Sequence, residues 1–204
     1  MQIVPVTLEG RNIRLEPLRI EHLGALCAVG LDEDLWRLTT TQVHTPAQMR
    51  AYVETALDEA ARGVALPFAT VERASGTVVG CTRFADIQRE HRTVEIGWTW
   101  VGRAWHRTPV NTEAKYLMLR HAFETWRCIR VSLKTDSINE RSRRAILRLG
   151  AKEEGTFRNH MITASGRIRH TRYFSVIDSE WPSVKADLEA NLARPFERPA
   201  SVSP

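Results

Sequence analysis

Three strand-like segments follow one another closely between residues 67 and 101, and this run most constrains the fold. They span 67–73, 77–84 and 93–101, with a Ser75-Gly76 turn between the first two and a polar loop before the third. Connections this short join neighbouring strands that run in opposite directions. The run therefore predicts an antiparallel meander, which a helical pattern at 109–126 follows.

Helical and strand patterns on both sides of this run extend the order of elements. Thr45 and Gln48 form a capping box before one helix, and Ser137 with Glu140 is expected to cap another. The expected helices span 19–29, 46–62, 109–126 and 138–149, with a last helix that carries Trp181, Val184, Leu188 and Leu192, and the remaining strands span 12–16, 128–134, 154–161 and 169–177. This order predicts the α/β class, with a mixed, mostly antiparallel sheet flanked by helices on both faces.

Length and apolar content suit one domain. The chain has 204 residues, 43% of them hydrophobic, and we expect a single domain over 1–192 followed by a disordered tail at 193–204, which holds three prolines. No apolar stretch reaches the roughly 18–20 residues that a membrane span needs, and residues 1–17 lack a signal-peptide pattern. We therefore expect a cytoplasmic protein without membrane contact. The cysteines and histidines lack the spacing of metal ligands, so no metal is expected.

The charge balance favours an anionic partner. The formal net charge is +5 and the isoelectric point is about 9.5, with arginine runs at 141–148 and 167–172. A nucleic acid, a phosphorylated cofactor and a solvated basic surface all fit this balance.

The segment 93–101 carries one carboxylate in the middle of an apolar strand pattern. Its alternation predicts one face with Val94, Ile96, Trp98 and Trp100, and a second face with Glu95, Gly97, Thr99 and Val101. Glu95 is then either a surface residue or one paired with a nearby arginine, or it is a group beside a cleft that accepts a proton directly or through a water molecule.

The segment WHRTPVNTEA, residues 105–114, has two physical interpretations. Thr108 as N-cap and Pro109 at the first helical position are favourable capping chemistry. Alternatively, the free amides of the helix start, with Arg107 beside them, form a cradle for phosphate.

Two polar residues near the start of the expected helix 138–149 also leave alternatives open. Ser142 interrupts an apolar face formed by Ile138, Ala145 and Leu149, so its hydroxyl either bonds back to the Ile138 carbonyl or is available for chemistry. Asn139 either caps the helix or binds an amide group of a ligand.

Together, several segments resemble the GNAT acyltransferases, which use acyl-coenzyme A, and in particular the branch that contains ribosomal-protein N-terminal acetyltransferases. The resemblance rests on LEGRNIRLEPL, VEIGWTWV, NTEAKYLMLRHAFE, NERSRRAILRLGAKEEG and YFSVIDSEW. It covers nearly the whole chain, and it implies acetyl-coenzyme A as co-substrate and a homodimer as a plausible assembly.

The resemblance also implies roles for individual residues. Glu95 matches the strand carboxylate that serves as base in some members, and Ser142 would lie near the thioester sulfur and donate a proton to the leaving thiolate. Asn139 would contact the pantetheine arm. The same arm would take backbone hydrogen bonds from Trp98, Thr99, Trp100 and Val101.

The predicted phosphate cradle departs from the family pattern of Gln or Arg, two residues, Gly, one residue, then Gly or Ala. Residues 105–110 lack all of these, and Pro109 removes a donor outright. We expect fewer amides than usual and altered coenzyme binding. The groups expected to hold the phosphates are the amides around Thr108, Val110, Asn111 and Thr112, with Arg107 and the arginine-rich helix that includes Arg144.

These inferences predict an N-acetyltransferase that moves an acetyl group directly from acetyl-coenzyme A to a primary amine. The acceptor is open between a protein N-terminus and a small-molecule amine, and His160 and His170 either line its pocket or lie on the surface. A non-catalytic acyl-coenzyme A sensor is the alternative. An RNA-binding module is disfavoured because the sequence has no stacking or groove-reading motif.

Overall fold

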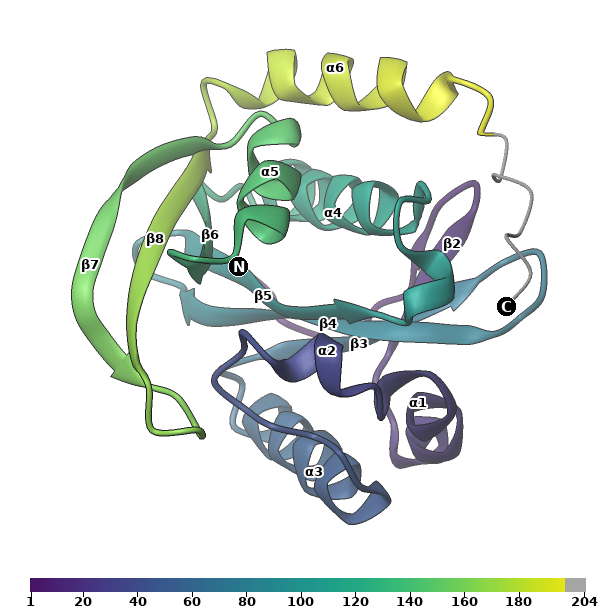
Figure 1. Cartoon of the computed structure of the whole chain (residues 1–204). Helices are drawn as coiled ribbons and strands as arrows, with labels where there is room; N and C mark the ends of the chain where they lie inside the picture. Colours follow the sequence, from purple (N-terminus) through teal and green to yellow (C-terminus); the bar gives the residue numbers. More distant parts are fainter. Residues whose placement is uncertain (197–204) are drawn as a thin grey trace.

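One sheet runs through the computed structural model, which describes residues 1–196 (Figure 1). It has eight strands in the order β1-β2-β3-β4-β5-β6-β8-β7, and β5 and β6 run parallel while all other neighbours are antiparallel. The strands are β1 (Leu8–Glu9), β2 (Ile13–Pro17), β3 (Leu66–Glu72), β4 (Val78–Gln88), β5 (Thr93–Val101), β6 (Arg130–Asp136), β7 (Lys152–Ile162) and β8 (Ile168–Ile177). The predicted class and the β3–β4–β5 meander are confirmed.

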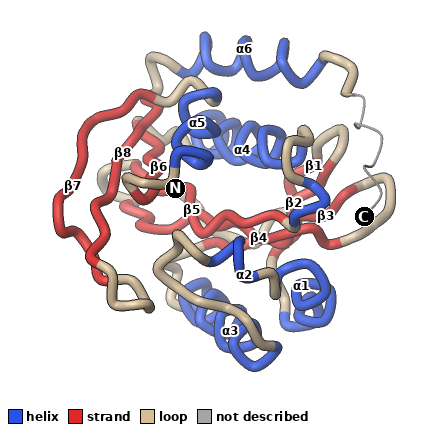
Figure 2. The backbone as a smooth tube through the Cα atoms, in the orientation of Figure 1, coloured by secondary structure: helices blue, strands red, loops and turns tan. Residues whose placement is uncertain are grey.

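Helices cover both faces of this sheet (Figures 1 and 2). On one face lie α1 (Leu23–Gly30), α2 (Glu33–Trp36) and α3 (Pro46–Ala61), and on the other lie α4 (Val110–Arg120), α5 (Glu140–Arg148) and α6 (Trp181–Ala193). A π-helical turn, His121–Thr125, continues α4, and 3-10 turns occupy Ile20–His22 and Arg103–Trp105. The capping box of Thr45 and Gln48 is confirmed, with both of its hydrogen bonds formed.

The two helical layers bury separate hydrophobic cores. Phe84, Ile96, Leu117, Met118 and Phe174 belong to the core between the sheet and the α4 side. Leu26, Trp36, Met49, Val53 and Trp100 belong to the core on the α3 side. A fully buried side chain of this size contributes about 1.5–3 kcal/mol, so both layers hold the sheet in place.

Parts of the chain-level prediction remain predictions. The expected domain over 1–192 is not tested, and residues 197–204 of the expected tail lie outside the described part of the chain. Within the described part, no helix combines the length and the apolar character that crossing a bilayer requires.

A β-bulge in β5 changes which residues share a face. Cys81 of β4 lies opposite Trp100 and Arg83 lies opposite Gly97, so two residues of β5 face the single residue between Cys81 and Arg83. Trp98, in this bulge, has a φ of +48°, a conformation that costs energy for a residue with a side chain.

The predicted alternation along β5 is therefore wrong beyond the bulge. The extra residue reverses the phase, so Val94 and Ile96 pack in the core on the α4 side whereas Trp100 packs on the α3 side. The Thr99 hydroxyl instead contacts Lys115 of α4.

The parallel strands β5 and β6 separate soon after they meet. In the described structure they pair at three positions, Thr93 with Arg130, Val94 with Val131 and Glu95 with Ser132, and both strands continue beyond the last pair. We call the region between residues 96–101 of β5 and 133–136 of β6 the β5–β6 opening. Its edges carry backbone groups that β5 and β6 do not use for each other.

Candidate active site at the β5–β6 opening

Glu95 lies at the point where the two strands separate. It is 4% exposed, and its Oε2 lies 2.8 Å from Nζ of Lys134 on β6. Burial raises the pKa of Glu95 above its ordinary value of 4.5, and the positive charge of Lys134 opposes that rise. Glu95 is therefore ion-paired, but with a lysine rather than the arginine that the sequence suggested, and its role as a base stays a prediction.

Aromatic and cationic side chains extend from this ion pair through Trp98, and we call them the Trp98 cluster. The Arg83 guanidinium lies 5.1 Å from the ring centroids of both Tyr52 and Trp98. The Lys134 ammonium lies 5.7 Å from the Trp98 ring and 6.0 Å from the Tyr173 ring. Since Trp98 is 38% exposed, the cluster forms part of the surface on the α3 side.

Sequence reasoning missed Arg83, Tyr52 and Lys134. Arg83 is 1% exposed and pairs with Glu59 of α3 at 2.7 Å, while its Nε is buried without a hydrogen-bond partner among the described residues. A cation inside the apolar strand pattern 78–85 was the available signal, because an unpaired buried guanidinium is costly. No local pattern marks Lys134 as a partner of Glu95.

A small cavity adjoins the cluster. Its volume is about 230 Å³, and Glu59, Val64, Ala85, Asp86, Ile87, Gln88 and Trp98 line it. This is below the roughly 300–1,000 Å³ of a typical ligand site, so it fits only the end of a larger molecule. Glu59 already pairs with Arg83, so Asp86 is the lining carboxylate that favours a positively charged group there.

The start of α4 differs by one residue from the prediction. The helix begins at Val110 rather than Pro109, and Pro109 rather than Thr108 is its N-cap residue, although Pro109 already has helical dihedral angles. The Thr108 hydroxyl donates to the Trp105 carbonyl at 2.7 Å and accepts only a long 3.4 Å bond from the Val110 amide. It therefore stabilises the preceding turn more than the helix.

This helix start retains the features of an anion site. The first i to i−4 bond runs from the Glu113 amide to the Pro109 carbonyl at 2.8 Å, so the amides of Asn111 and Thr112 precede it. Arg107 is exposed beside them. Arg141 of α5 reaches Nδ1 of His106 at 3.5 Å, and burial, with a smaller effect of this arginine, lowers the pKa of His106. These amides and two nearby arginines, Arg107 in the preceding turn and Arg141 at His106, fit an anion site, and the binding of phosphate there stays a prediction.

The start of α5 also corrects the prediction. Asn139, and not Ser137, caps the helix, since its Oδ1 accepts the Ser142 amide at 3.0 Å. The capping interpretation of Asn139 is confirmed, and its contact with a ligand stays a prediction. Among residues 1–196 the Ser142 hydroxyl has no hydrogen-bond partner, so the bond to the Ile138 carbonyl is not formed. Arg144 is exposed, and its Nε donates to the Glu140 carbonyl at 3.3 Å.

Two of the strand carbonyls predicted to meet the pantetheine arm already accept hydrogen bonds. The Tyr52 hydroxyl donates to the Trp98 carbonyl at 3.3 Å, and Nε2 of His106 lies 2.8 Å from the Val101 carbonyl. The indole of Trp100 lies 5.5 Å from that of Trp36 inside the α3-side core. Trp98, Thr99, Trp100 and Val101 as coenzyme contacts stay predictions.

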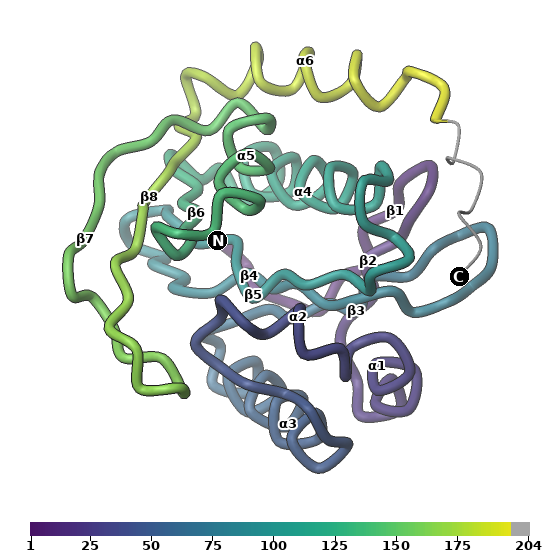
Figure 3. The backbone as a smooth tube through the Cα atoms, in the orientation of Figure 1, coloured from purple at the N-terminus to yellow at the C-terminus, as the bar shows by residue number. Residues whose placement is uncertain are grey.

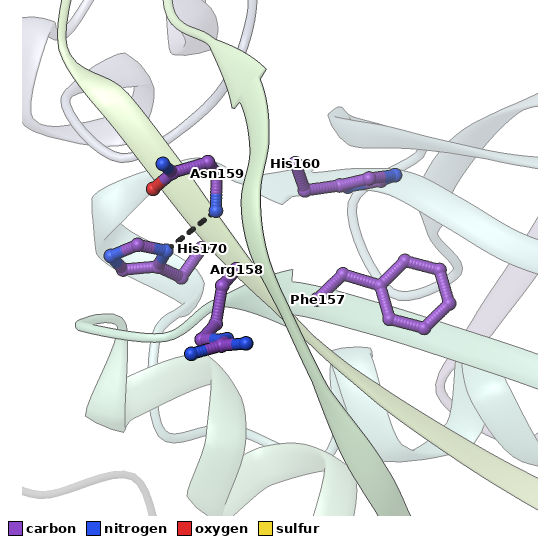
Figure 4. Close-up of a pocket in the computed structure, with 5 residues that line it drawn as sticks. All are labelled: Phe157, Arg158, Asn159, His160 and His170. Carbon is purple, nitrogen blue, oxygen red and sulfur yellow. Dashed lines mark hydrogen bonds between the residues drawn. The ribbon is translucent and has the colours of Figure 1, made fainter.

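His160 and His170 occupy different positions on the β7–β8 ribbon. Both line an open groove of about 730 Å³ with Phe157, Arg158 and Asn159 (Figure 4). Nδ1 of His170 accepts the Asn159 amide at 2.8 Å, which ties it to the ribbon backbone. The His160 ring instead lies 5.8 Å from the ring of Tyr173 in the Trp98 cluster. His160 is therefore the histidine that adjoins the opening.

Comparison with known proteins points to one family. The model described as "Acetyltransferase (GNAT) domain" matches residues 12–152. A GCN5-related N-acetyltransferase from Brucella melitensis has a similar crystal structure, with 34% identity, coverage of 94% of this chain and 87% of that chain, and a TM-score of 0.87.

Two more distant proteins carry more specific names. One is YdaF of Bacillus subtilis (strain 168), whose name assigns it provisionally to the ribosomal N-acetyltransferases. The two sequences are 27% identical over 110 residues, which cover 54% of this chain and 59% of YdaF. A structure of Mycobacterium smegmatis RimJ in complex with CoA-disulfide shares the fold, at 22% identity, coverage of 88% of each chain and a TM-score of 0.75.

Proposed function

Since the chain belongs to the GNAT acetyltransferase family, we propose that this acyl-coenzyme A dependent N-acyltransferase moves an acetyl group from acetyl-coenzyme A directly to a primary amine. The observation that carries the proposal is the β5–β6 opening with a buried carboxyl, Glu95, at its closed end. Direct transfer requires a base beside the incoming amine and no nucleophile from the protein.

The residues around the opening fit acetyl-coenzyme A. The amides of Asn111 and Thr112, with Arg107 and Arg141, suit its pyrophosphate, and the unpaired edge of β5 suits the peptide-like pantetheine arm. Asn139 keeps its amide NH₂ for the arm because only its Oδ1 serves the helix cap. The proposed coenzyme contacts are Trp98, Thr99, Trp100, Val101, Arg107, Thr108, Val110, Asn111, Thr112, Asn139 and Arg144.

Proton transfer is the chemistry that the protein supplies. An α-amine with a pKa of about 8 is roughly one-tenth neutral at pH 7, whereas a lysine amine with a pKa of about 10.4 is only about 0.04% neutral. The raised pKa of Glu95 brings it closer to the amine that it deprotonates. Ser142, whose hydroxyl has no partner in the described chain, returns a proton to the departing thiolate.

The acceptor that the site suits best is the amino terminus of a protein. The small cavity next to Trp98 takes only the end of a molecule, and the carboxylate of Asp86 in its lining suits an ammonium group. The similarity to YdaF supports the same branch of the family. A small-molecule amine is the competing acceptor. The cytoplasmic location stays a prediction from the sequence pattern, and the homodimer stays a prediction from the resemblance.

The test is a thiol-release assay with the full chain, acetyl-coenzyme A and a panel of peptides and small amines. We expect release with peptides that have a free amino terminus and none with the same peptides blocked by N-acetylation. Release with amino sugars alone would assign a small-molecule acceptor. Binding of acetyl-coenzyme A without release for any amine would contradict the enzyme and identify a sensor.

A further inference from the structure

Lys134 places an amine inside the proposed active site. It lies on β6 two residues beyond Ser132, the last residue that pairs with β5, and its side chain reaches Glu95 at the closed end of the opening. Its ammonium is held by the Glu95 carboxylate at 2.8 Å and lies near the rings of Trp98 and Tyr173. A carboxylate and two aromatic rings form a good binding site for an ammonium ion.

We propose that Lys134 is a modification site, which the protein acetylates with its own active site. The inference rests on the proposed function, because it uses the same acetyl donor and the same base. Any acceptor must bring its nitrogen to Glu95 at the β5–β6 opening, and the Lys134 nitrogen is already there. The side chain of Lys134 is 26% exposed, so it has room to turn toward the thioester.

The other lysines lack this combination. The chain has four lysines, all within the described residues. Lys185 pairs with Glu124 at 2.8 Å and Lys152 with Glu180 at 2.6 Å, but both lie away from β5 and β6. Lys115 is buried on the α4 side, where its Nζ contacts the hydroxyls of Thr82 and Thr99. Lys185 is therefore a matched control, with the same ion-pair distance and no access to the opening.

The reaction balances with the groups present and acetyl-coenzyme A. The Lys134 ammonium first gives one proton to the Glu95 carboxylate, and the neutral Nζ then attacks the carbonyl carbon of the thioester. A nitrogen–carbon bond forms and the carbon–sulfur bond breaks. A second proton from Nζ passes to the leaving thiolate, and Glu95 returns its proton to water. The products are Nζ-acetyl-Lys134 and free coenzyme A.

The experiment incubates the full chain with acetyl-coenzyme A and no added amine, and follows the intact mass and the acetylated peptides with time. We expect the mass of one acetyl group to appear on Lys134 about a hundredfold faster than on Lys185, the low end of the effect of a positioned base. Lys134→Arg keeps the cation but has no primary amine, so it should lose this modification. Lys185→Arg should retain it.

A second variant separates proximity from catalysis. Glu95→Gln should slow the labelling of Lys134 about a hundredfold and leave the slow labelling of Lys185 unchanged. Equal labelling of Lys134, Lys152 and Lys185 would overturn the inference, since it would reflect unassisted reaction with the coenzyme.

The outcomes also separate this inference from the proposed function. Thiol release with added amines, but an unmodified Lys134, would overturn the inference alone. Labelling of Lys134 without turnover of any added amine would support it and contradict transfer to an external acceptor. No reaction of either kind would overturn both.

Discussion

Glu95 and Glu113 are each 4% exposed, but their carboxylates have different kinds of partner. Glu113, in the first turn of α4, accepts backbone amides of Arg11, Asn12 and Ile13 at 2.5–3.1 Å. These bonds tie α4 to the turn of the β1–β2 hairpin and the first residue of β2, and Figure 3 shows both strands next to α4. Glu95 instead faces one flexible amine at the β5–β6 opening.

The comparison shows that burial alone does not identify a functional carboxylate. Backbone amides cannot leave Glu113 without local unfolding, so its hydrogen bonds belong to the fold. The partner of Glu95 is a side chain that rotates away at much lower cost, and the strands around it are already separated. A carboxylate with a replaceable partner is the one that can exchange protons with a substrate.

The largest expected effect is on turnover by Glu95→Gln. The amide cannot accept the proton of the amine, so we expect kcat/KM to fall about 10²–10⁴-fold, most for acceptors with a high pKa. Steady-state kinetics with a peptide α-amine and a lysine-like amine measure it. Glu124→Gln removes a carboxylate paired at the same distance with Lys185 and should leave the rates unchanged. Equal activity of Glu95→Gln on lysine-like amines would exclude Glu95 as the base.

Glu113→Gln should have the opposite effect, since it should lower the stability of the fold and leave the turnover nearly unchanged. The substitution weakens charge-assisted hydrogen bonds to three backbone amides, and we expect the free energy of unfolding to fall by about 1.5–3 kcal/mol. Denaturant melts at 25 °C measure this change, and kcat/KM below the transition should stay within about twofold. A large loss of turnover with unchanged stability would contradict the structural role of Glu113 and its difference from Glu95.

The pH profile sharpens the assignment of Glu95. Because burial raises its pKa, the carboxyl takes up a proton at a pH above its ordinary 4.5, and kcat/KM should fall about tenfold per pH unit below that raised pKa. Glu95→Gln should lack this step while the step from the acceptor amine remains. The same step in both proteins would assign it to another group.

The sign for stability follows from the same shift. Just above pH 4.5 the folded protein binds more protons at Glu95 than the unfolded chain does, so this group makes stability fall as the pH rises toward the raised pKa. Glu95→Gln should remove that slope. Denaturant melts of both proteins across this range measure it.

Ser142→Ala is expected to have a smaller effect on the same reaction. A thiolate whose parent pKa is about 8.5 requires little assistance, so kcat should fall only about tenfold. Affinity for acetyl-coenzyme A, measured by calorimetry, should not change. Unchanged rates would limit Ser142 to packing on α5.

Arg107→Ala should have the smallest effect, on the coenzyme alone. Its side chain is exposed, and exposed charge pairs contribute about 0.2–1 kcal/mol, so affinity for acetyl-coenzyme A should weaken about two- to fivefold. Higher salt should reduce the difference between the variant and the original chain. The same affinity at low salt would refute a role of Arg107 in binding phosphate.

The parts of the fold that sequence reasoning predicted depend on local signals. The capping box of Thr45 and Gln48 and the strand 93–101 are set by residues within a few positions of one another. The bulge at Trp98 is not, because it arises from the register of β5 against β4. That single extra residue reversed the predicted face of Trp100.

The sequence names candidate residues of the site but not the partners that they contact. Glu95, Ser142 and the start of α4 follow from motifs, but the pairing of Glu95 with Lys134 depends on the parallel contact of β5 and β6. The partners of Glu113 lie about a hundred residues earlier in the chain. Contacts across such separations are set by topology, which one-dimensional periodicity does not contain.

Because β5 and β6 separate, the middle of the sheet lacks some inter-strand backbone hydrogen bonds. A ligand with amide groups can form hydrogen bonds with these strands in their place. Under the proposed function that ligand is acetyl-coenzyme A, so its binding would complete the hydrogen bonding of the sheet and also prepare the reaction. A ligand that binds only the folded state at a hundred times its Kd adds about 2.7 kcal/mol of resistance to unfolding. The stability of this protein would then depend on the concentration of acetyl-coenzyme A around it, and ligand-free molecules would unfold first.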